Sequence, residues 1–166
     1  MEFGFVIFLL SSTLLGHSSG FTTYYEPTTD AEITASSLGP VGSCSGHFTE
    51  RAGEFASPQY PNRYPHYAHC TWRIQSLERK FIALRFLYVD IEASTGCRYD
   101  AVHVYDGPSA SSPLLGSVCG LQTRSFSSSG NNLTVVFASD NTGNGGGFVA
   151  QWVFTGELIT KYSSIL

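Results

Sequence analysis

The sequence of 166 residues is poor in charge, with 13% charged residues against about 25% in an average soluble domain. Positive charge is especially scarce: there are nine Lys and Arg residues, and no basic cluster is denser than the pair Arg79-Lys80. Nucleic acids and anionic membrane surfaces are bound through clustered basic side chains. The formal net charge of −4 and the lack of a basic cluster therefore argue against both classes of partner.

Long apolar runs are also lacking. The run FVIFLL at residues 5–10, extended by two leucines at 14 and 15, is shorter than the roughly 18–20 apolar residues of a membrane-spanning helix. It has the length of the apolar part of a signal peptide, and the small residues Ser18 and Gly20 suit a cleavage site. We predict a signal peptide over residues 1–20, no membrane insertion and a secreted, extracellular protein. No Lys or Arg precedes the run, so a buried strand or an uncleaved tail is the alternative.

The motifs of common catalytic sites do not occur. Outside the predicted signal peptide, the sequence contains no G-x-S-x-G, and it contains no H-E-x-x-H and no G-x-x-x-x-G-K anywhere. His66 and His69 lie among turn residues, so they are not expected to share a face, and no serine has the setting of an activated nucleophile. We therefore predict that the protein is not an enzyme.

Four cysteines, Cys44, Cys70, Cys97 and Cys119, are present without any C-x-x-C motif. This spacing disfavours a zinc site. Because a secretory compartment is oxidising, we expect two disulfides, for which three pairings are possible.

The distribution of apolar residues divides the chain into segments. Residues 21–43 are rich in Thr, Ser, Pro and Gly and are predicted to form an exposed linker. Over residues 44–155, apolar residues alternate with period two, as in Ile82, Leu84 and Phe86, and turn sequences separate the runs. Several short strands at this spacing predict an all-β antiparallel sandwich, followed by a polar tail at residues 156–166.

Acidic residues lie at the ends of several of the predicted strands. They are Asp90, Glu92, Asp100 and Asp140, and the loops after these strands could bring them together at one end of the sandwich. Carboxylate oxygens suit Ca²⁺, and like charges in close proximity repel one another without a cation. From spacing alone, solvated acids at strand ends are the simpler interpretation.

A series of short motifs in a fixed order resembles the CUB domain family over residues 44–155. These motifs are FASPQYPNRYP (55–65), CTWRI (70–74), DIE (90–92), CRYD (97–100), VYDG (104–107), CG (119–120), FASD (137–140) and GFVA (147–150). The sequence is most similar to CUB domains of secreted mucosal and zymogen-granule glycoproteins. The resemblance implies a jelly-roll-like sandwich of two antiparallel sheets with disulfides Cys44–Cys70 and Cys97–Cys119.

The resemblance also implies a Ca²⁺ site. Glu92, Asp100 and Asp140 match the three carboxylate ligands of calcium-binding CUB domains, and Tyr64 matches the tyrosine that supports an acidic ligand by hydrogen bonding. After Asp140 the family often supplies Ser and Asn, whereas this chain has Asn-Thr-Gly. The resemblance therefore leaves the Thr142 carbonyl as the expected additional ligand, and it puts the affinity in doubt.

In calcium-binding members of the family, the site accepts a Lys ammonium group from a partner protein. The implied function is therefore a calcium-dependent contact, through Tyr64, Glu92 and Asp140, with an exposed Lys of an extracellular protein. Carbohydrate or glycoconjugate binding, as in the spermadhesins, is an alternative suggested by the aromatic pair Tyr24-Tyr25, which we expect to be exposed in the linker. A third possibility is a fragment of a larger mosaic protease or glycoprotein that contains CUB domains.

The sequence Asn132-Leu-Thr134 is an acceptor motif for N-glycosylation, and a secreted protein could use it. The pair Asn131-Asn132 is equally typical of a turn that enters a strand. We predict a glycan on Asn132.

Overall fold

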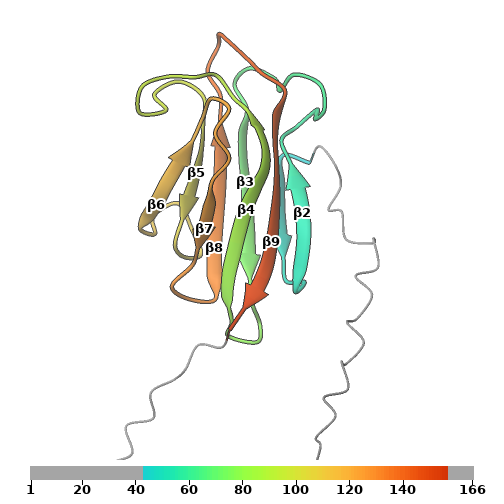
Figure 1. Ribbon diagram of the computed structural model, residues 1–166, viewed down its shortest axis with the longest axis vertical. Coiled ribbons are helices and arrows are strands. Elements are labelled where there is room, and N and C mark those ends of the chain that lie inside the picture. Colours follow the sequence, from blue (N-terminus) through green and yellow to red (C-terminus); the bar gives the residue numbers. More distant parts are fainter. Residues whose placement is uncertain (1–42, 157–166) are drawn as a thin grey trace, which may run out of the picture. The chain divides into compact units, whose positions relative to one another are not determined.

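The computed structural model describes residues 43–156, which form nine strands (Figure 1). In chain order the strands are β1 (Ser45–Phe48), β2 (Ala52–Ala56), β3 (His69–Gln75), β4 (Phe81–Asp90), β5 (Ala101–Tyr105), β6 (Leu114–Val118), β7 (Ser125–Ser127), β8 (Asn132–Ala138) and β9 (Gly147–Thr155). The predicted signal peptide, nearly all of the linker and all but the first residue of the tail lie outside the described residues. Within residues 43–156, no helix is long and apolar enough to cross a bilayer.

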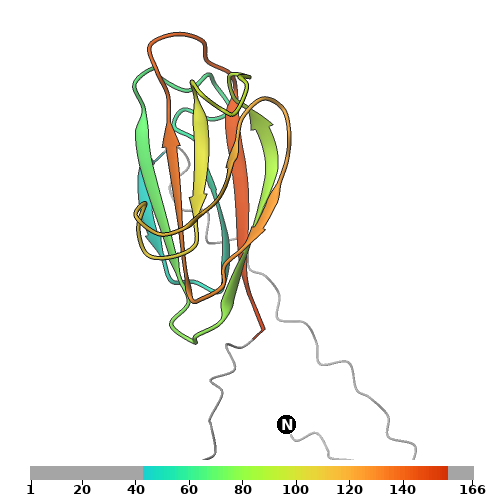
Figure 2. The same ribbon diagram turned by 90° about the vertical axis from the view of Figure 1, so that its left-hand side faces the viewer.

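The strands form two sheets, which Figure 2 shows as two layers. One sheet has the strand order β1-β3-β8-β5-β6 and the other has the order β2-β9-β4-β7. Every strand pair is antiparallel except β1 with β3, which is parallel. The chain makes β2 in the opposite sheet between these two strands, and so returns to the first sheet running in the same direction. The all-β sandwich is confirmed, with this one parallel edge pair.

The core lies between the two sheets and is rich in aromatic side chains. Successive side chains of a strand point to opposite faces, and the predicted apolar alternation therefore fills the interior with residues such as Trp72 and Trp152, each 1% exposed. The ring of Phe148 is central: its centroid lies 5.7 Å from that of Phe137 and 5.6 Å from that of Trp72. Burial of each large apolar side chain contributes about 1.5–3 kcal/mol, which makes this core a rigid support for the loops at its ends.

Two disulfides join Cys44 to Cys70 and Cys97 to Cys119. They are the pairs that the resemblance implies. The second disulfide ties the loop after β4 to the residue that follows β6, and a two-way backbone hydrogen bond between Ile91 and Gly120 (2.9 and 3.0 Å) adds to this connection. The loop that carries Glu92 is therefore fixed to the opposite sheet.

At one end of the sandwich, the end of β4 pairs with the beginning of β9, and the end of β8 pairs with the beginning of β5. Asp90 of β4 is the partner of Gly147 in β9, and Ala138 of β8 is the partner of Ala101 in β5. These four strand ends carry the loops in which the predicted acidic residues lie.

Candidate metal centre

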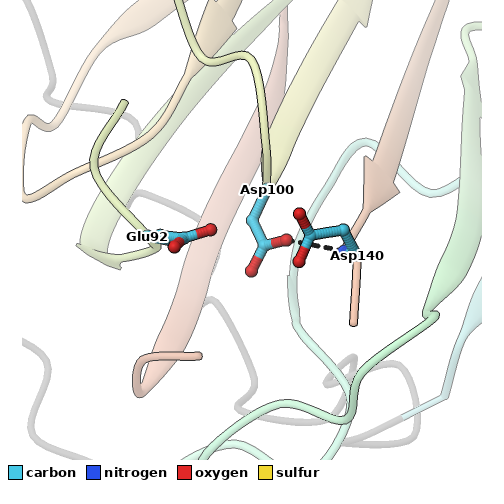
Figure 3. A group of neighbouring side chains, drawn as sticks. All are labelled: Glu92, Asp100 and Asp140. Carbon is cyan, nitrogen blue, oxygen red and sulfur yellow. Dashed lines mark hydrogen bonds between the residues drawn. The ribbon is translucent and has the colours of Figure 1, made fainter. Parts of the chain in front are cut away.

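Three acidic side chains meet at one end of the sandwich: Glu92, Asp100 and Asp140, which we call the acidic tip (Figure 3). One carboxylate oxygen of each residue lies within 4.8 Å of the others. Glu92 lies two residues beyond β4, Asp100 directly precedes β5, and Asp140 lies two residues beyond β8. Figure 3 shows the carboxylate of Asp100 between those of the other two. The resemblance implied that these three acids share one site, and the structure brings them together.

Asp100 is the fixed member of the acidic tip. Its side chain is fully buried, and both of its oxygens accept hydrogen bonds. Oδ2 accepts one from the hydroxyl of Tyr64 at 2.7 Å, and Oδ1 accepts one from the backbone N–H of Asp140 at 2.7 Å. Each carboxylate oxygen has two lone pairs, so one on each remains for a cation.

Tyr64 links two parts of the acidic tip. Its ring is fully buried and meets the ring of Phe137 edge-on, with centroids 5.1 Å apart. Its hydroxyl donates to Asp100 and accepts from the backbone N–H of Glu92 at 3.0 Å. Burial, together with the Asp100 carboxylate, raises the pKa of the Tyr64 hydroxyl far above its usual value. The hydroxyl therefore stays protonated and positions Asp100 and Glu92 relative to each other.

Glu92 has the most unusual environment of the three. Its Oε2 is the one buried side-chain oxygen of residues 43–156 without a hydrogen-bond partner. Loss of hydration raises the pKa of Glu92, and the neighbouring carboxylates of Asp100 and Asp140 raise it further. A buried carboxylate oxygen without a partner is unfavourable, and a cation between the three carboxylates would supply the partner and offset the repulsion. The residues present therefore fit a bound cation.

The loop after β8 orients Asp140. Its Oδ1 accepts hydrogen bonds from the backbone N–H of Thr142 at 2.8 Å and from the Thr142 hydroxyl at 3.3 Å. Its backbone carbonyl accepts from the N–H of Tyr67 at 2.9 Å. Thr142 thus contacts a candidate ligand through its N–H and hydroxyl, and its carbonyl as a ligand stays a prediction.

Gly143 leaves the space that the Glu92 carboxylate occupies. Its φ is +57°, and a Cβ atom at this position would overlap the Glu92 side chain. From the sequence, this glycine counted only as a missing ligand. The structure gives it a steric role that no spacing rule could have revealed, because the contact joins residues from two different loops.

Asp90 does not join the acidic tip, although it was among the acids that could converge there. Its Oδ2 accepts a hydrogen bond from the backbone N–H of Gly146 at 2.7 Å. In the same loop, the Asn144 side chain donates to the carbonyl of Tyr64 at 3.0 Å, and Arg63 donates to the Asn144 carbonyl at 2.8 Å. Asp90 therefore supports the loop from Gly143 to Gly147 and is not a candidate ligand.

The glycosylation motif lies far along β8 from the acidic tip. Asn132 is half-buried at the start of the strand, and its side-chain amide donates to Asn131 Oδ1 at 2.9 Å. Thr134 is buried, and its hydroxyl donates to the carbonyl of Gly107 at 2.8 Å. A glycan on Asn132 stays a prediction.

The chemistry of the acidic tip favours a hard cation. The group offers carboxylate oxygens and contains neither His nor Cys, whereas zinc and copper sites in proteins generally use nitrogen or sulfur ligands. Oxygen-only sites with several carboxylates are typical of Ca²⁺.

Comparison with known proteins identifies relatives of the part of the chain that forms the sandwich. A family model described as the CUB domain matches residues 44–152. The human "CUB and zona pellucida-like domain-containing protein 1" is 39% identical over 112 residues, and the match covers 68% of this chain and 18% of the human protein. The chain thus spans less than a fifth of that relative.

Two solved structures are similar as well. One is the full extracellular region of zebrafish Gpr126/Adgrg6: the match covers 69% of this chain and 15% of the zebrafish chain, with 34% identity and a TM-score of 0.62. The crystal structure of the MASP-1 CUB2 domain bound to Ca²⁺ matches 65% of this chain and 96% of its own, with 30% identity and a TM-score of 0.58.

Proposed function

Because this chain belongs to the CUB domain family, we propose that it is a secreted, non-catalytic module that binds a partner protein in a calcium-dependent manner. The acidic tip holds the Ca²⁺ ion and contacts a basic side chain, foremost a Lys, of the partner. The observation that carries the proposal is Oε2 of Glu92, which is buried without a hydrogen-bond partner beside two further carboxylates.

In this proposal the three carboxylates are the metal ligands, and the Thr142 carbonyl and water complete the six to eight oxygens that Ca²⁺ takes. Tyr64 acts one step away from the metal, because it holds Asp100 and the backbone of Glu92. Bound Ca²⁺ supplies positive charge that offsets the repulsion between the carboxylates. The MASP-1 CUB2 domain, which was solved with Ca²⁺, is 30% identical to this chain and supports the choice of ion.

Partner binding uses the carboxylates of Glu92 and Asp140, apart from the buried Oε2 of Glu92, because both residues are only half-buried. An ammonium group can donate up to three hydrogen bonds to such oxygens. Charged contacts at an exposed rim are weakened by salt, so one domain binds weakly. High affinity then requires several copies of the module on one assembly.

The experiment is thermal unfolding of the full chain with millimolar Ca²⁺ and with chelator. We expect Ca²⁺ to raise Tm, since a ligand at 100 times its Kd stabilises the folded state by about 2.7 kcal/mol. Asp100→Ala and Glu92→Gln should each abolish the rise. Glu78→Gln is the matched control, because Glu78 is exposed and forms an ion pair with Lys80, away from the acidic tip. No rise in the wild-type protein would contradict the metal site.

Carbohydrate binding is a second candidate, which two exposed tyrosines favour. Tyr67 is 75% exposed and donates its N–H to the carbonyl of Asp140, and Tyr99 is 57% exposed and precedes Asp100. Tyrosine rings beside a polar site are suited to stacking on sugars. A glycan array probed with and without chelator separates the two candidates. Binding to defined glycans that survives chelator but is lost in a Tyr67→Ala, Tyr99→Ala variant would favour carbohydrate.

A further inference from the structure

The outward face of the four-stranded sheet is exposed and largely apolar. On β9 and β4, Val153 is 42% exposed and Leu87 is 43% exposed, and the neighbouring Ala83 is half-buried. Away from the Asp90 end of β4, the strands of this described sheet carry just two charged residues, Glu54 on β2 and Arg85 on β4. Contiguous apolar surface with polar residues around it is typical of an interaction site.

The two charges lie symmetrically about the central strand β9. Glu54 and Arg85 are both register partners of Gln151, one on each side of it. Neighbouring strands are about 4.8 Å apart, so the acid and the base are nearly equidistant from β9. Gln151 donates its side-chain amide to Glu54 at 3.1 Å, and the ion pair of the described residues, Lys80–Glu78, involves neither charge.

We propose that a second copy of this chain packs on this face, related by a twofold axis that runs along β9 within the interface (Figure 1). Such an axis exchanges the two sides of β9. It therefore places Glu54 of each copy opposite Arg85 of the other, twice over, with Gln151 near the axis. The interface is self-complementary, as a twofold interface must be.

The residues next to this charged row fit the same arrangement. Val153 lies between Ala52 and Ala83 in the register, so the axis passes near Val153 and places an alanine opposite an alanine on either side. Small side chains allow two sheets to approach at the usual spacing of about 10 Å. An axis across the strands would instead place Glu54 opposite Glu54 and Arg85 opposite Arg85, so the charge pattern favours the axis along β9.

The axis has a consequence for binding that rests on the proposed function. A rotation about an axis parallel to the strands leaves both acidic tips at the same end of the dimer. Two tips that face the same way can engage two basic side chains of one partner assembly, which raises the apparent affinity without new contacts. The dimer itself requires no Ca²⁺.

The test is sedimentation of the full chain, secreted from eukaryotic cells, at 1–100 µM with Ca²⁺ and with chelator. We expect a monomer–dimer equilibrium that chelator leaves unchanged, which separates this claim from the calcium site. Glu54→Arg and Arg85→Glu should each raise the dimer Kd at least tenfold. A 1:1 mixture of these two variants should restore dimerisation to within threefold of wild type, because both opposed pairs become attractive again.

Arg73→Glu is the matched control, since Arg73 is an exposed residue of β3 in the other sheet, and it should leave the Kd unchanged. A wild-type chain that stays monomeric at 100 µM overturns the proposal, whether another protein or another segment of this chain covers the face. Single variants that dimerise as wild type does, or a mixture that does not regain the dimer, also overturn it. If the mixture dimerises, both variants must be folded. If it does not, circular dichroism of each variant shows whether that variant is folded.

Discussion

Replacement of Tyr64 by Phe removes a single oxygen from the centre of the proposed site. The ring stays the same size and keeps its edge-on packing against Phe137. What is lost is the 2.7 Å hydrogen bond to Asp100 and the acceptor for the N–H of Glu92. The substitution therefore tests the role of the hydroxyl without a change in the core.

The expected loss of stability follows from the burial of Asp100. Removal of one partner from a buried acceptor costs about 1–3 kcal/mol, and we take about 2 kcal/mol, because Oδ1 of Asp100 keeps its bond to Asp140. For a domain of this size, this corresponds to a decrease in Tm of about 8 °C. Ca²⁺ affinity should fall about 10- to 100-fold, as is typical when a residue that orients a metal ligand is lost.

The assay is urea unfolding without Ca²⁺, followed by calorimetric titration with Ca²⁺. Tyr99→Phe is the matched control: Tyr99 is 57% exposed and directly precedes Asp100, and its variant should retain wild-type values in both assays. If Tyr64→Phe also retained wild-type stability and Ca²⁺ affinity, the hydroxyl would not position the ligands, and this account of the site would be wrong.

Three further predictions concern the space that Gly143 leaves for Glu92, the second disulfide and the half-buried His103. Gly143→Ala should abolish the rise in Tm on addition of Ca²⁺, because the new Cβ displaces the Glu92 carboxylate, whereas Gly130→Ala, where a Cβ meets open space, should retain the full rise. Replacement of both Cys97 and Cys119 by Ser should lower the free energy of unfolding by about 3 kcal/mol in chemical denaturation, and an unchanged value would mean that this bridge adds no stability. Burial lowers the pKa of His103 below 6.5, so as pH falls through 6.5 the unfolded chain takes up the proton first and the fold loses stability. The pH dependence of unfolding should therefore be shallower below pH 6.5 in His103→Gln, and an identical pH profile would contradict this assignment.

Much of the fold could be predicted from the period-two pattern of apolar residues. On β4, Ile82, Leu84 and Phe86 face the core of the sandwich, as their alternation indicates. The parallel pairing of β1 with β3 could not be predicted, because β1 is only four residues long and its pairing depends on the path of the chain through the other sheet. Local patterns indicate that a residue lies in a strand, but not which strand is its neighbour.

The candidate site was predictable in its charged residues and in Tyr64, which bonds to Asp100 as the resemblance implies, but not in its other supports. An acid at the end of a strand is visible in the sequence, and three of the four such acids do meet. The separate role of Asp90 depends on a hydrogen bond to Gly146, across a loop that no local pattern places. The same holds for Gly143, whose importance arises only from its contact with Glu92.

The central claim is that Ca²⁺ binds between Glu92, Asp100 and Asp140. A crystal structure of the chain grown with Ca²⁺ tests it most directly. We predict one ion that contacts an oxygen of each of the three carboxylates at about 2.3–2.6 Å, with Tyr64 still bonded to Asp100. Crystals with millimolar Ca²⁺ in which no ion lies between these carboxylates would contradict the account.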